Sequence, residues 1–251
     1  MRNILIIARR DLRAQFNSPV AYVVVGGALL LIGVMFFMIP RMAGGFFVSF
    51  WDVDRASMDQ LFEYLPLVLS LFVIPAVTMR TLAAEKGSGT LELLITMPVR
   101  DSEVILGKYI AACATVCILL AGTLLYPIAM FTWPWHLGSL DWGPVWSGYL
   151  GCALFSLAGV ALGMMLSSVT ESDVIAFFMT SGVLCVLYAV GWMVSVLPGG
   201  LGDAIGFVSF QTRYQAFARG LIDTRAVIYF LSVAIVCLLV SFRSLESRKW
   251  S

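Results

Sequence analysis

The residue types that most often perform chemistry are few in this sequence, and their spacing matches no known catalytic set. The single histidine, His136, has no second histidine with which to bind haem, and no Gly-x-Ser-x-Gly sequence provides a serine nucleophile. Gly107 and Lys108 lack the upstream glycine of a phosphate-binding loop. Cys113 and Cys117 share a helix face and would allow a metal pair, although their apolar neighbours favour two small core residues. We therefore expect no catalytic, cofactor or metal site in this chain.

A short polar segment, residues 80–100, is the part of the sequence best suited to bind a partner. It lies between two long apolar runs, and Gly87 ends the helix before it. Ser88 is placed to cap a new short helix, which Pro98 ends. This helix is rich in leucine, so it either fits an apolar groove on another protein or dips its leucines into lipid. The residues alone support both interpretations equally.

The elements that position this segment are predicted from composition. The chain has 251 residues, of which 60% are hydrophobic and only 12% are charged, whereas a soluble domain is about 25% charged. The bilayer is therefore the expected solvent, and a span needs about 20 apolar residues. We predict an all-α integral membrane fold, with residues 1–251 forming one domain. Its six transmembrane helices are expected at residues 20–39, 63–82, 104–132, 145–168, 174–197 and 225–242.

The N-terminal segment, residues 1–18, has apolar residues on one helical face and arginines on the other. This pattern is typical of an amphipathic helix that lies in the membrane interface. The alternative is a cytoplasmic extension of the first membrane helix. The segment is too charged for the head of a cleaved signal peptide, so we expect it to be retained.

The distribution of basic residues predicts the orientation of the chain. With the N-terminus in the cytoplasm, 11 of the 16 Lys and Arg residues lie on the cytoplasmic side of the predicted spans and 5 lie outside. Basic residues are enriched in cytoplasmic loops. An even number of spans then places both termini in the cytoplasm.

Two segments on the predicted outer side are unusual. Residues 41–60 combine aromatic and acidic residues, which favours an interfacial hairpin or helix. Residues 198–223 are apolar enough to enter the membrane but too rich in glycine to span it, which predicts a re-entrant hairpin before the sixth span. Within this hairpin, Arg213, Tyr214 and Arg219 are candidates for an outer gate or a contact with an envelope partner or lipid head groups. The alternative is a structural lid.

Small residues in the fourth predicted span indicate close helix packing. Gly159 and Gly163 are four residues apart, so they share one helix face. Such faces allow two helix backbones to approach closely. The partner helix is expected either within the same subunit or in a second subunit.

A resemblance joins these observations. The sequence from Glu85 to Leu94, followed by Pro98, resembles the motif between the second and third spans of ABC-2 (type V exporter-like) transporter permeases. The order of the predicted elements is also similar, from the amphipathic first helix to the re-entrant segment before the sixth span. The stretch 209–220 resembles the branch that contains the gliding-motility permease and the nitrous-oxide-reductase maturation permease.

The resemblance implies a coupling helix at about residues 88–96 that docks into a cleft of a separate ABC ATPase subunit. The residues implied in this contact are Glu85, Gly89, Thr90, Leu91, Glu92 and Leu94. Two ATPase subunits would bind ATP and Mg²⁺, and two permease subunits, identical or related, would lie side by side in the bacterial inner membrane. An accessory envelope protein and membrane lipids are further expected partners, and the near-neutral charge speaks against nucleic acid.

A second hypothesis is a membrane scaffold or anchor for an ABC-powered envelope assembly or motility complex. The feature that favours it is the shortage of charged residues in the predicted spans, because a transport pathway for ions or protons usually needs them. An intramembrane enzyme is a weaker alternative because catalytic residues are missing. The sequence does not specify the substrate.

Overall fold

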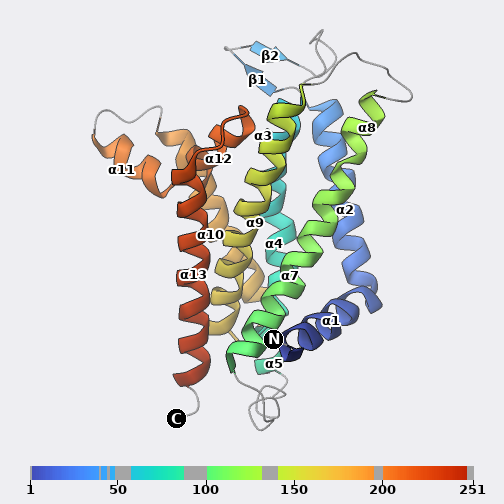
Figure 1. Ribbon diagram of the computed structural model, residues 1–251, viewed down its shortest axis with the longest axis vertical. Helices are drawn as coiled ribbons and strands as arrows, with labels where there is room; N and C mark the ends of the chain where they lie inside the picture. The colour runs from blue at the N-terminus through green and yellow to red at the C-terminus, as the bar shows by residue number, and fades with distance from the viewer. Residues whose placement is uncertain are drawn as a thin grey trace.

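The computed structural model describes residues 2–39, 41–43, 46–48, 58–87, 101–131, 141–194 and 200–247. Within these ranges the chain is a bundle of helices with one small pair of strands (Figure 1). The prediction of an all-α membrane fold with six spans is confirmed. Six helical segments are long and apolar enough to cross a membrane: Pro19–Met38, Asp59–Gly87, Asp101–Met130, Trp142–Val169, Asp173–Met193 and Thr224–Glu246.

The first helix, α1 (Arg2–Asn17), is a separate element from the first span, α2 (Pro19–Met38). Ser18 interrupts the two helices, and its hydroxyl accepts a hydrogen bond from the amide of Val20 at 3.3 Å. Pro19 occupies the start of α2, where its missing N–H costs nothing. In Figure 1, α1 lies across the end of the bundle at which both termini are found. We call this end the base; it contains α1, α5 and the end of α13.

The second span, predicted at residues 63–82, is longer and less regular than expected. It consists of α3 (Asp59–Val68), a π-helical turn η2 (Leu69–Val73), α4 (Ile74–Thr78) and α5 (Ala83–Gly87). Pro75 is the second residue of α4, close after the π-helical turn. Because proline has no amide hydrogen to donate, a wider turn before it relieves the backbone.

The third span is divided, which differs from the single helix predicted at residues 104–132. It consists of α7 (Asp101–Thr123) and α8 (Leu125–Phe131), separated by a turn at Leu124. Pro127 follows this turn, and a proline cannot donate to the carbonyl four residues earlier.

The fourth span, α9 (Trp142–Val169), lies at the centre of the bundle. It packs against α4, α7, α10 (Asp173–Met193) and α13 (Thr224–Ser247). Gly159 and Gly163 face α4 of the same chain: a Cβ at Gly159 would lie 2.7 Å from Ile74 Cδ1, and one at Gly163 would collide with Thr78. These two positions therefore allow α4 and α9 to approach closely within one subunit.

The opposite end of the bundle holds two features that the sequence placed outside the spans. Strands β1 (Arg41–Ala43) and β2 (Phe46–Val48) form an antiparallel hairpin, with Met42 opposite Phe47. Between the fifth and sixth spans lie two short helices, α11 (Gly200–Val208) and α12 (Phe210–Ala218). Figure 1 shows α12 close to α13 and α11 extending away from the bundle. We call α11 and α12 the cap.

Candidate functional site

Most of the predicted ATPase-contact residues lie outside the described residues. Gly89, Thr90, Leu91, Glu92 and Leu94 all fall within residues 88–100. Glu85 is described, and it lies in α5, immediately before that segment. The candidate site is therefore built from the surroundings of α5 at the base.

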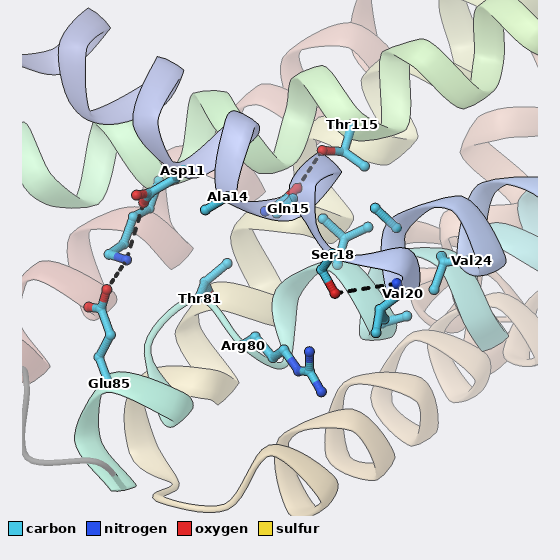
Figure 2. A pocket seen from close by; sticks show the side chains of 14 residues that line it. Asp11, Ala14, Gln15, Ser18, Val20, Val24, Arg80, Thr81, Glu85 and Thr115 are labelled. Carbon is cyan, nitrogen blue, oxygen red and sulfur yellow. Dashed lines mark hydrogen bonds and ion pairs between the residues drawn. The ribbon is translucent and has the colours of Figure 1, made fainter.

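The centre of this site is a lysine that sequence reasoning did not select. Lys108, in the first half of α7, is only 5% exposed. Its Nζ lies 2.5 Å from Glu85 Oε1 in α5 and 3.3 Å from Asp11 Oδ2 in α1 (Figure 2). We call these three residues the ion cluster. A signal was present in the sequence, because Lys108 is a charge inside a predicted span, and such charges are functional candidates.

Helix α1 is held along α7 on both sides of the ion cluster. Asn3 donates a hydrogen bond to Glu103 at 3.1 Å, and Thr115 donates one to Gln15 at 2.6 Å. Between them α1 approaches the backbone of α7, since a Cβ at Gly107 would lie 2.7 Å from the side chain of Ile7. Polar bonds at both ends and a close contact in the middle make α1 and α7 one packed unit.

The segment around α5 is also fixed on its other side, to α9 and α10. Ser167 Oγ accepts hydrogen bonds from the amides of Leu82 at 3.3 Å and Ala83 at 3.0 Å. Lys86 donates to the carbonyl of Ser168, and Arg80 Nε lies 3.7 Å from Asp173 Oδ2. Helix α5 is therefore bonded to α7 and, through Lys108, linked to α1, while α5 and the turn before it are bonded to α9 and α10.

A cavity of about 270 Å³ opens beside the ion cluster, between α1, α2 and the α4–α5 segment. Its polar wall includes Gln15, Arg80 and Thr81, and its apolar wall includes Val20 and Val24 (Figure 2). The cavity leaves open space between α1 and the turn that joins α4 to α5. Movement of this turn is therefore less restricted by packing than movement within the close-packed centre of the bundle.

The predicted outer residues do not form one cluster. Tyr214 is buried, and its hydroxyl lies 3.2 Å from Cys152 Sγ in α9. Burial, together with Cys152, raises the pKa of Tyr214 well above its usual value, so the hydroxyl stays protonated. Arg213 instead stacks over Phe207, 4.8 Å from the ring centre, and Arg219 ends α12 in an exposed position. Tyr214 therefore belongs to the packing of the bundle, whereas the two arginines belong to the cap.

Metal ligation finds no support in the described part of the chain. No three Cys, His, Asp or Glu side chains among the residues that the structure places come together as a metal site. Cys113 is partly buried and Cys117 is exposed, and both are free thiols.

The comparison with known families agrees with this architecture. The profile described as "ABC-2 family transporter protein" matches residues 52–243, which include every span after α2 and the cap. No curated protein matches the chain. Because the match covers well over half of the sequence, this multi-pass membrane protein belongs to the ABC-2 transporter family.

Proposed function

We propose that this chain is the permease subunit of an ABC transporter and couples ATP hydrolysis in a separate ATPase subunit to movement of its spans. The observation that carries the proposal is the family match, which reaches the five spans after α2, combined with the position of α5. Helix α5 leads directly into residues 88–100 and is bonded to α7 and α9. A force on residues 88–100 would thus be transmitted to several spans at once.

In this proposal residues 88–96 form the coupling helix. Leu91 and Leu94 supply an apolar anchor for a cleft of the ATPase, because they lie three residues apart and share a helix face. Glu92 lies in the first turn, where a carboxylate favours the positive end of the helix dipole. Closure of the ATPases would bias the permease between two conformations only through contacts that differ between them.

The base faces the cytoplasm in this proposal. Both termini lie at the base, and the six spans return the chain to its starting side. The excess of basic residues on this side agrees with the positive-inside rule. The cap then faces outward, where Arg213 and Arg219 would meet lipid head groups or an envelope partner.

A second candidate function is an anchor for ABC-powered envelope assembly, without transport of a small solute. The specific observation that favours it is the apolar character of the spans among the residues that the structure describes. The resemblance of residues 209–220 to the gliding-motility and nitrous-oxide-reductase maturation permeases agrees with it. A continuous cavity between two paired permease subunits would favour transport instead.

The test replaces one leucine of the proposed coupling helix. Leu91→Asp places a charge on the anchor face, and Leu93→Asp, two residues further on, places the same charge on the opposite face. Each variant is co-expressed with the ABC ATPase encoded beside it, purified through a tag on the permease, and assayed for co-elution and ATP hydrolysis. We expect loss of co-elution with Leu91→Asp and retention with Leu93→Asp. If no ATPase is recovered even with the unchanged chain, the proposal is wrong.

A further inference from the structure

We infer that Lys108 is the positioning residue through which the N-terminal helix α1 takes part in the ATP-driven movement. This inference rests on the proposed function, since it assumes that residues 88–100 receive the force. It concerns residues that lie outside the coupling helix itself. It assigns α1 a role in transmitting the ATP-driven movement, in addition to anchoring the chain in the membrane interface.

The first argument is the position of the ammonium group between two elements. Lys108 Nζ contacts Glu85 in α5 and Asp11 in α1, so one charge connects the end of the second span to the N-terminal helix. The lysine is 5% exposed, and the two carboxylate side chains are 16% and 23% exposed. In such surroundings a lysine is strongly disfavoured without a carboxylate partner. If α5 shifts, Lys108 must either follow Glu85 or move closer to Asp11.

The second argument is that the contact between Lys108 and Asp11 lies in the middle of the interface between α7 and α1. Asn3 bonds Glu103 near one end of the contact and Gln15 bonds Thr115 near the other, with Lys108 between them. A displacement of Lys108 is therefore carried along α1 rather than absorbed at one residue. Asp11 and Lys108 are 97 residues apart in sequence, so only the packing of α1 along α7 brings them together.

The third argument is that α5 and the turn before it border open space on the side of α1. Residues 79–82 between α4 and α5 form a turn rather than a helix, and the cavity of about 270 Å³ lies beside Thr81 and Glu85. The two bonds of the ammonium are also unequal, at 2.5 Å to Glu85 and 3.3 Å to Asp11. An ammonium has three donors and can change their balance between two acceptors without losing either. The ion cluster thus has the properties of a small two-state contact.

The experiment measures hydrogen–deuterium exchange in the purified complex of the full chain with its ABC ATPase, with and without ATP and vanadate. The change in deuterium uptake of peptides that cover α5 shows whether nucleotide affects the end of the second span. The change in peptides that cover α1 shows whether the effect extends to the N-terminal helix. In the unchanged chain we expect nucleotide to alter deuterium uptake in both helices. This readout needs no knowledge of the transported substrate.

Three variants in α1 test the contact between Asp11 and Lys108. Asp11→Asn keeps the size of the side chain and leaves the bond between Lys108 and Glu85 in place, and Asp11→Glu retains the carboxylate. Arg13→Gln removes a charge from an exposed position of the same helix. With Asp11→Asn we expect the nucleotide response of α1 to fall by about fivefold, the lower range of allosteric coupling, while the response of α5 remains. Asp11→Glu and Arg13→Gln should retain both responses.

The outcomes separate this inference from the proposed function. A response in α5 without a response in α1 of the unchanged chain would overturn the inference and leave the proposed function intact. An α1 response that persists in Asp11→Asn would also overturn it, because α1 would then be linked by packing alone. A complex in which neither helix responds to nucleotide would overturn the proposed function, and the inference with it.

Discussion

The two ends of the bundle are held together by different interactions. At the base, helices are joined by charges: Lys108 contacts Asp11 and Glu85, and Arg80 contacts Asp173. Towards the cap, they are joined by aromatic rings, and Phe155 of α9 lies edge-to-face against rings from α10, α12 and α13. Arg213 in the cap is likewise held by aromatic faces.

This difference indicates which end can change its contacts. Ionic contacts in a low-dielectric site are strong but can pass from one partner to another without leaving a cavity. Packed rings have one arrangement that fills space, and any shift forfeits contact over the whole ring. Under the proposed function, the base would therefore be the end that moves when an ATPase subunit closes, and the cap end would be the fixed support.

The largest effect is expected from Phe155→Ala, which removes the ring that joins four helices near the cap. Phe155 is fully buried, so its loss leaves a cavity and should lower the free energy of unfolding by about 4 kcal/mol. The measurement is reversible unfolding of the purified protein in detergent micelles. Leu150→Ala is the control, because Leu150 lies on the same helix but is 42% exposed. An equal decrease in the free energy of unfolding of both variants would show that aromatic packing does not stabilise the cap end of the bundle.

A somewhat smaller effect is expected from Lys108→Met, which keeps the length of the side chain but removes its charge. Glu85 and Asp11 then lose the cation that both contact, although Arg10 still lies 2.9 Å from Asp11. Because Asp11 keeps Arg10 as a partner, the loss should lie at the lower end of that for broken buried pairs, about 3 kcal/mol. The same unfolding measurement applies.

The control for Lys108→Met is Arg10→Met, which removes the other cation from Asp11. The side chain of Arg10 is 53% exposed, and exposed ion pairs contribute less than about 1 kcal/mol. A loss of stability as large as that of Lys108→Met would mean that Asp11, rather than the buried lysine, organises the base.

Local chemistry explains why the sequence predicted most of the fold. Each span is an apolar run of sufficient length, and caps such as Ser18 mark where a helix begins. The predicted boundaries differ from the structure by several residues, because α3 begins earlier, at the polar residues Asp59 and Gln60, and because residues 83–87 form a further short helix after a turn. The turn at Leu124 was not predicted, because tertiary packing decides how the helix accommodates Pro127.

The candidate site was harder to predict because its members are distant in sequence. Asp11 and Lys108 are 97 residues apart, and Glu85 and Lys108 are 23 apart. No periodicity connects such positions, and only the helix packing brings them together. Glu85 was selected for its place in the motif, without any sign of its partner. The other residues of the predicted ATPase contact, within 88–100, remain a prediction.

The smallest effect is expected from Tyr214→Phe, which removes one hydroxyl and keeps the ring. The variant loses the contact between this hydroxyl and Cys152 Sγ but retains the packing of its ring against Phe155. A net loss of about 1 kcal/mol is typical of one hydrogen bond. In a Cys152→Ala background the same change should cost less, because the partner is already absent, and unfolding of the four proteins of this cycle measures the difference. If Tyr214→Phe costs as much as Phe155→Ala, the hydroxyl rather than the ring holds α12, and the contrast between an ionic base and an aromatic cap end is wrong.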